Sequence, residues 1–200
     1  MGRTLISTEI QEGYTVEWAM VDSQHLKSKI CLVGESAVGK TSLVRRYVQD
    51  AFSDDYLMTL GTKVSKKIEQ VATPGLTVRV DMAIWDIMGQ PGLLDLVRDA
   101  YFTGAHGILA VADFTRLSSL ERLQMWIRNV RQVAGTIPVL LVVNKNDRVR
   151  EAQFTLEEVE RLAPTYATGY VMTSAKTGEN VEEAFRRMAS LVVKSQLRLA

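Results

Sequence analysis

The stretch Gly34-Glu35-Ser36-Ala37-Val38-Gly39-Lys40-Thr41 decides how this 200-residue sequence is interpreted. It matches G-x-x-x-x-G-K-[ST] at every fixed position, between an apolar run at Ile30–Val33 and an amphipathic stretch at Ser42–Val48. The two glycines let the backbone curl, so that several N–H groups and the start of the following helix face one anion. Lys40 adds a full positive charge, and the Thr41 hydroxyl is a ligand for Mg²⁺. The pattern therefore predicts a phosphate-binding loop; an ordinary strand-to-helix turn is the alternative.

Short apolar runs alternate with longer amphipathic stretches along most of the chain. The runs largely lack polar alternation, as expected for parallel strands that are buried on both faces. They are Ile30–Val33, Thr77–Trp85, Gly107–Ala112, Val139–Val143 and Gly169–Met172. The helix-like stretches are 39–50, 93–102, 118–134, 155–163 and 179–196. This order predicts an α/β doubly wound fold.

One pair of strands departs from the parallel pattern. Thr62–Val71 and Thr77–Trp85 are joined by Ala72-Thr73-Pro74-Gly75, a turn sequence that is too short for a crossover helix. We therefore expect an antiparallel hairpin at the edge of the sheet.

Residues 1–27 stand apart as an N-terminal extension before a domain at 28–200. A strand-like pattern is formed by Tyr14, Val16, Trp18 and Met20, which alternate with Thr15, Glu17, Ala19 and Val21. Glu12-Gly13 can turn that segment back on Leu5–Ile10 as a β-hairpin. The alternative is a lead-in with little structure of its own.

The side of the site that binds the metal and positions the attacking water is predicted from Asp86, Thr59 and the pair Gly89-Gln90. Asp86 ends an apolar strand, where a carboxylate that holds Mg²⁺ is expected in a phosphate-loop protein. Thr59 lies in the loop after the first helix and supplies a second hydroxyl ligand that reaches the metal only with a γ-phosphate, as an order–disorder switch. Gly89 can approach that phosphate, and Gln90 can orient the attacking water.

Two tetrapeptides at strand ends predict the base-reading side. Asn144-Lys145-Asn146-Asp147 places a carboxylate where it can accept from guanine N1–H and the 2-amino group, which adenine lacks. Asn144 can tie this loop to the phosphate loop, and the Lys145 stem can cover the base. Thr173-Ser174-Ala175-Lys176 offers the Ala175 N–H to guanine O6 and a second covering lysine. Ligands in open α/β sheets bind at these strand ends.

These motifs resemble the Ras superfamily of small GTPases, most like its Rab and Ran branches, over residues 28–195. The resemblance implies a P-loop NTPase small G domain: about six strands, mostly parallel with one antiparallel edge strand, and helices on both faces. It also implies switch loops at 52–62 and 86–102, with Phe52 packed edge-on against guanine and Tyr56 closing over the phosphates. The expected nucleotide-binding residues are Gly34, Ser36, Ala37, Val38, Gly39, Lys40, Thr41, Ser42, Phe52, Tyr56, Thr59, Gly89, Asn144, Lys145, Asp147, Ser174, Ala175 and Lys176.

The second switch departs from the family. The family often has Asp-Thr-Ala-Gly-Gln-Glu where this chain has Asp86-Ile87-Met88-Gly89-Gln90-Pro91. Pro91 biases Gln90 away from α geometry. We expect a GTPase switch with GTP or GDP and Mg²⁺ as ligands, with Gln90, Lys40 and Thr59 in hydrolysis and Thr41, Thr59 and Asp86 on the metal. The alternatives are a non-hydrolysing nucleotide-bound interaction module and, less in keeping with the base-reading motif, an ATP-dependent kinase.

The amino-acid composition limits the classes of binding partner and the cellular compartment that we expect for this protein. The 24 Lys and Arg residues against 23 Asp and Glu leave a formal charge of +1, which gives no support to nucleic-acid binding. The single cysteine, Cys31, excludes an internal disulfide and fits a reducing, cytoplasmic compartment. With no C-terminal cysteine, no lipid anchor is evident. The expected state is a monomer that meets effectors, an exchange factor and a GTPase-activating protein.

Overall fold

The computed structural model describes residues 22–53, 58–59, 61–90 and 98–198. Its sheet has six strands in the order β2-β3-β1-β4-β5-β6, and only β2 runs antiparallel to its neighbour. The strands are β1 (Asp22–Val33), β2 (Thr62–Thr73), β3 (Leu76–Ile87), β4 (Gly107–Asp113), β5 (Val139–Asn144) and β6 (Tyr170–Met172). The helices are α1 (Lys40–Gln49), α3 (Leu117–Glu121), α4 (Leu123–Ala134), α5 (Leu156–Tyr166) and α6 (Val181–Leu197), with a 3-10 helix η1 at Asn146–Glu151.

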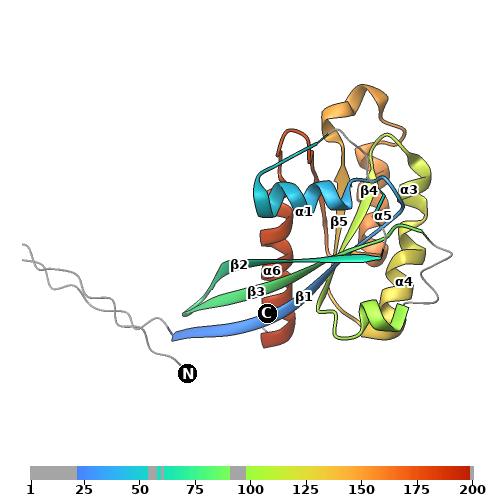
Figure 1. Cartoon of the computed structure of the whole chain (residues 1–200). Helices are drawn as coiled ribbons and strands as arrows, with labels where there is room; N and C mark the ends of the chain where they lie inside the picture. The colour runs from blue at the N-terminus through green and yellow to red at the C-terminus, as the bar shows by residue number, and fades with distance from the viewer. Residues whose placement is uncertain (1–21, 54–57, 60, 91–97, 199–200) are drawn as a thin grey trace, which may run out of the picture.

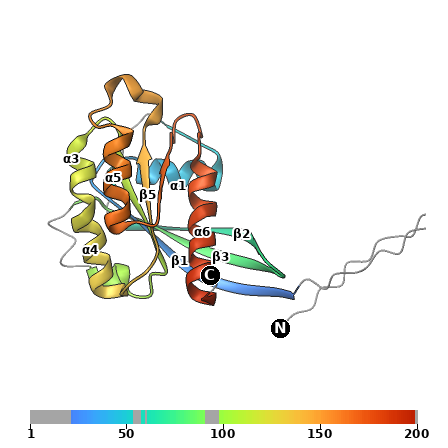
Figure 2. The same ribbon diagram turned by 180° about the vertical axis from the view of Figure 1, so that it is seen from behind.

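Helices cover both faces of the sheet. Helices α1 and α6 pack on one face, and α3, α4 and α5 pack on the other (Figures 1 and 2). Every residue of β4 and β5 is buried, as the unbroken apolar runs predicted. The predicted doubly wound α/β fold, with helices on both faces, is confirmed.

The antiparallel edge hairpin is confirmed as well. Strands β2 and β3 pair from Thr62↔Ile87 to Thr73↔Leu76, and β2 lies at the edge of the sheet. Gly75 in the turn has φ of 76°, a conformation that favours glycine.

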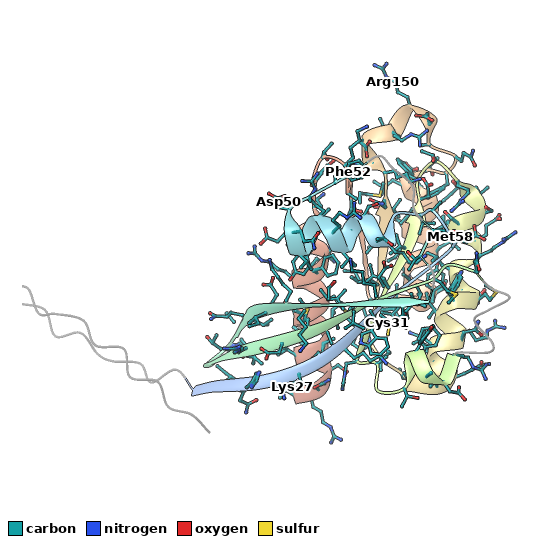
Figure 3. The ribbon with its side chains drawn as sticks, in the orientation of Figure 1. Lys27, Cys31, Asp50, Phe52, Met58 and Arg150 are labelled. Atoms are coloured by element: carbon teal, nitrogen blue, oxygen red, sulfur yellow. The ribbon has the colours of Figure 1, made fainter. Side chains whose placement is uncertain are left out.

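Strand β1 begins at Asp22 instead of the predicted Ile30. It pairs in parallel with β3 from Asp22↔Leu76 to Leu32↔Asp86, so that β1, β2 and β3 extend as a ribbon beyond the helices (Figure 1). In Figure 3, Lys27 lies toward the free end of this ribbon and Cys31 lies nearer the helices. Lys27 on one face of the strand is exposed and Ser28 on the opposite face is buried, because only one face of the sheet is covered there. The predicted hairpin within 1–21 lies outside the described residues.

The predicted helix over 118–134 is two helices. The break falls at Arg122, whose ψ of −7° takes it out of regular α geometry, and Met125 N–H donates to the Arg122 carbonyl three residues back. Buried Leu120 and Leu123 continue the apolar stripe across the break, so the hydrophobic periodicity of the sequence did not predict the break.

The remaining helix predictions agree with the structure. Helix α5 opens with a capping box: Glu158 N–H donates to Thr155 Oγ1, and Thr155 N–H donates to the Glu158 carboxylate. Residues 98–102 are helical, and the rest of the predicted 93–102 helix lies outside the described residues. Among the helices that the structure describes, none combines the length and the apolar character needed to cross a bilayer.

His106 joins β1 to the turn before β4. The Lys29 N–H donates to His106 Nδ1 at 3.0 Å, and the His106 N–H donates to the Lys29 carbonyl at 2.8 Å. Burial lowers the pKa of His106 below its ordinary 6.5, because desolvation penalises the charged ring. A protonated ring also loses the Nδ1 acceptor.

We expect the free energy of unfolding to fall as the pH drops from about 7.5 to about 5.5, in part through His106. The unfolded chain binds this proton more readily than the folded protein, so stability is kept above the ordinary pKa and lost below it. His106→Asn offers a carbonyl to the same N–H and does not titrate. Urea unfolding at both pH values should show a smaller pH dependence in the variant; an equal dependence would contradict the assignment.

Candidate functional site

The predicted phosphate loop connects β1 to α1, and two of its positions require glycine. A Cβ on Gly34 would lie 2.2 Å from the Val111 carbonyl oxygen, and one on Gly39 would lie 2.2 Å from Asn144 Nδ2. Both have positive φ, of 136° and 98°. The loop is therefore closely packed against β4 on one side and the end of β5 on the other.

Lys40 directs its charge into this loop. Its Nζ donates to the Gly34 and Glu35 carbonyls, each at 2.7 Å. Burial lowers the pKa of Lys40 to about 8, while the nearby Asp86 carboxylate acts in the opposite direction. A buried ammonium among backbone groups is suited to pair with phosphate oxygens.

The structure brings the three predicted metal ligands together. Thr41 Oγ1 donates to Asp86 Oδ2 at 2.6 Å and lies 2.9 Å from Thr59 Oγ1. The other carboxylate oxygen, Asp86 Oδ1, is buried and has no hydrogen-bond partner among the described residues. Burial raises the pKa of Asp86, because desolvation penalises the carboxylate. An unpartnered carboxylate oxygen beside two hydroxyl oxygens fits Mg²⁺, which prefers oxygen ligands.

Asn144 connects the phosphate side to the base side. Its Nδ2 donates to the Val38 carbonyl at 2.9 Å, and its Oδ1 accepts the Ala175 N–H at 3.1 Å. The tie from Asn144 to the phosphate loop is thus present as expected. The Ala175 N–H, which we expected to face guanine O6, is engaged by Asn144, so a bond to O6 would have to share that hydrogen.

The carboxylate that we predicted to read the base, Asp147, is held in place. Ser174 Oγ donates to Asp147 Oδ1 at 2.6 Å, which leaves the second carboxylate oxygen of Asp147 for a ligand. The Lys145 ammonium pairs with Asp113 Oδ2 at 2.6 Å, so its stem is drawn across this end of the sheet. These contacts order the two loops relative to each other.

A cleft of about 680 Å³ runs along these loops. The predicted residues that line it are Ser36, Ala37, Gly39, Lys40, Thr41, Ser42, Phe52, Thr59, Gly89, Gln90, Asn144, Lys145, Asp147, Ala175 and Lys176. Gly34, Val38, Asp86 and Ser174 are buried behind this lining. Tyr56 lies outside the described residues. The lining that the sequence did not predict is Arg45, Ser53, Met58, Ile87, Arg148 and Glu151.

The two predicted switch loops meet at Gln90. Its Nε2 donates to Met58 Sδ at 3.0 Å, and Met58 precedes Thr59 directly (Figure 3 labels Met58). A Cβ on Gly89 would lie 2.4 Å from Ser36 N, so Gly89 rests against the phosphate loop. Pro91 lies outside the described residues.

Sequence reasoning missed two charged residues that contact the phosphate loop. Arg116 and Arg122, from the segment after β4, reach the Ser36 carbonyl and the Glu35 carboxylate, respectively. No local sequence motif predicts these two contacts, because the partners are separated by 80 and 87 residues.

The comparison with known families agrees with this geometry. A model of the Ras family matches residues 29–194, most of the chain. The chain belongs to the Ras family. Ras-related protein RABD2b of Arabidopsis thaliana is 34% identical over 165 residues, which are 82% of this chain and 79% of that relative. Ras-related protein Rab-13 of Rattus norvegicus is 36% identical over 162 residues, or 80% and 77%.

Membership confirms the predicted Rab-like resemblance and the small G domain. In general terms, this Ras-family protein is a small GTPase. The human relative Ras-related protein Rab-8B is 36% identical over 80% of this chain, which agrees with the same assignment.

We expect Asn144→Ala to lower the free energy of unfolding by about 2–3 kcal/mol, because it leaves the Val38 carbonyl and the Ala175 N–H unpaired in a buried site. Chemical unfolding at one fixed GDP concentration measures the change.

The matched control is Asn146→Ala, whose exposed amide contacts Glu179. That substitution should change stability by only about 0.5 kcal/mol. Equal effects of the two variants would contradict the role assigned to Asn144.

Proposed function

We propose that this protein binds GTP and GDP together with Mg²⁺, and hydrolyses GTP slowly, as a switch whose loops at 52–62 and 86–102 change partner affinity. The supporting observation is the contact of Thr41 Oγ1 with both Asp86 and Thr59, beside the Lys40 ammonium. That contact gathers residues from three separate segments at the expected position of the β- and γ-phosphates.

The phosphate side supplies positive charge and oxygen ligands. Lys40 leaves the Gly34 and Glu35 carbonyls to pair with the β- and γ-phosphates, and the phosphate-loop N–H groups contact the same anion. Thr41 and Thr59 hydroxyls, with Asp86 directly or through water, hold the metal. Bound Mg²⁺ neutralises charge that develops on the phosphate oxygens.

Hydrolysis needs one water in line with the bond that breaks. Water attacks the γ-phosphorus, the bond from that phosphorus to the β–γ bridging oxygen breaks, and the products are GDP and inorganic phosphate. Gln90 orients this water, for which its amide must leave Met58 Sδ. Positioning and charge neutralisation then contribute most of the catalysis.

The base side discriminates guanine. The Asp147 carboxylate accepts from N1–H and the 2-amino group, while Ser174 holds its other oxygen. Asn144 keeps this loop in register with the phosphate loop, and the stems of Lys145 and Lys176 cover the base. Adenine would leave the carboxylate without donors in a partly closed cleft.

The test of the function is the nucleotide content of the purified protein by chromatography, followed by single-turnover GTP cleavage with and without Mg²⁺. We expect bound GDP or GTP and a rate on the order of 10⁻⁴–10⁻³ s⁻¹ that requires Mg²⁺. Retention of neither nucleotide, with equal affinity for ATP, would overturn the proposal.

A non-hydrolysing interaction module is the second candidate, because the Gln90 amide is already engaged by Met58 Sδ. No product over many hours, with guanine nucleotide still bound, would favour it. Effectors, an exchange factor and a GTPase-activating protein would act on the switch loops in the hydrolysing case.

Gln90→Leu should slow single-turnover hydrolysis by about tenfold or more and leave GTP affinity within about threefold, because the amide acts on the water. Gln70→Leu, an exposed glutamine of β2, is the matched control. Loss of GTP affinity in step with the rate would contradict the role of Gln90.

Asp147→Asn should shift base preference from guanine toward xanthine by at least about a hundredfold, because the new amide N–H can donate to the xanthine 2-oxo group. Competition titrations with GDP and XDP measure the preference. The exposed Asp50→Asn should leave it unchanged. Equal guanine and xanthine affinity in the wild type would remove the basis of this assignment.

A further inference from the structure

The peptide between Glu35 and Ser36 is held from two sides. On one side, a Cβ on Gly89 would lie 2.4 Å from Glu35 C and 2.4 Å from Ser36 N, so the second switch loop contacts this peptide directly. Arg116 Nη2 donates to the Ser36 carbonyl at 2.7 Å, which fixes the adjoining Ser36–Ala37 peptide from the segment after β4. The Glu35 carbonyl also accepts from Lys40 Nζ.

The Glu35 side chain strengthens this attachment. Its carboxylate is largely buried, and Oε1 accepts from Arg122 Nη1 at 2.5 Å. Arg116 Nε lies 3.9 Å from Oε2, so two guanidinium groups face one buried carboxylate. Removal of one member would leave charge uncompensated at the loop, which is costly in a partly buried site.

The arginines belong to an ordered turn. The Arg116 N–H donates to the Asp113 carbonyl at 2.9 Å, and Ser119 Oγ donates to the Arg116 carbonyl at 2.6 Å. Asp113 also pairs with Lys145 on the base side. Arg122 lies at the break between α3 and α4, where its side chain leaves the helix surface toward Glu35. This turn therefore connects the base loop to the phosphate loop.

We propose that Glu35 is a positioning residue, which Arg116 and Arg122 hold in place. It fixes the Glu35–Ser36 peptide, against which Gly89 packs when a γ-phosphate is bound. Glu35 acts through Gly89 and so places Gln90; its carboxylate does not touch the nucleotide. This inference rests on the proposed function. It predicts that Glu35, Arg116 and Arg122 affect GTP binding and hydrolysis more than they affect GDP binding.

The selectivity has a physical reason. Gly89 approaches the phosphate loop to meet a γ-phosphate, which GDP lacks; GDP is held by Lys40, the phosphate-loop N–H groups and the base-side contacts without a contribution from Gly89. A displaced Glu35–Ser36 peptide should therefore weaken binding of a GTP analogue and slow hydrolysis, with little effect on GDP. A purely structural cluster would affect both nucleotides alike.

The experiment compares Glu35→Gln and Arg122→Gln, and the double variant, with the wild type. Affinities for GDP and for a non-hydrolysable GTP analogue are measured by titration with Mg²⁺, and hydrolysis by single turnover. We expect each single variant to slow hydrolysis by about tenfold or more and to weaken analogue binding relative to GDP by about fivefold. The double variant should match Glu35→Gln within about threefold, because both changes break one interaction.

Matched controls are Glu182→Gln, which breaks an exposed Glu182–Arg186 pair on α6, and Arg128→Gln, an exposed arginine on α4. Both should behave as the wild type. Equal losses for GDP and the analogue, no change in either, or additive effects in the double variant would overturn the positioning role.

The design separates a failure of the Glu35 proposal from misfolding of a variant and from a failure of the proposed function. If Glu35→Gln does not fold, Arg122→Gln decides alone, because its side chain is 60% exposed and its removal leaves the helices intact. Wild-type hydrolysis tests the proposed function by itself. The analogue-to-GDP affinity ratio tests Glu35 even if the wild type binds nucleotide without cleaving it.

Discussion

The buried carboxamide of Asn144 is the interaction on which the site depends. It donates to Val38 in the phosphate loop and accepts from Ala175 after β6, while Gly39 packs so closely on it that no Cβ fits. Both polar ends of the amide are paired, so this residue specifies one relative position for loops that are far apart in the chain. The cleft along these loops exists because the loops are held in register.

The parallel sheet makes that register possible. Strands β1, β4, β5 and β6 all run in one direction, so their carboxyl ends meet at one edge and present their loops together. The long β1–β3 ribbon carries Asp86 to the same edge, and the loop after α1 brings Thr59 to it. Fold and site therefore share one cause, the topology of a doubly wound sheet with an antiparallel edge hairpin.

The switch region differs from the rest of the site in how it is held. Asn144 and Thr41 make short, direct bonds, whereas Gln90 meets the described part of the first switch loop through the thioether of Met58. The contact of Gly89 with the phosphate loop is steric. A site with firmly held loops and a weakly tethered Gln90 amide is suited to the switch function that we propose, in which the state depends on one phosphate group.

The sequence by itself determined the glycine-rich turn between β1 and α1, the polar loops after β5 and β6, the hairpin and the alternation of strands and helices, because each is a local pattern of glycines, charges or periodicity. Only the tertiary structure decided that β1 begins at Asp22, because Leu26 is the one apolar residue over 22–29 and no apolar run marks this part of the strand. It also decided the break at Arg122 and the grouping of Glu35 with Arg116 and Arg122. The grouping depends on contacts between residues 80 and 87 positions apart, and the start of β1 depends on its pairing with β3, so no local spacing encodes either feature.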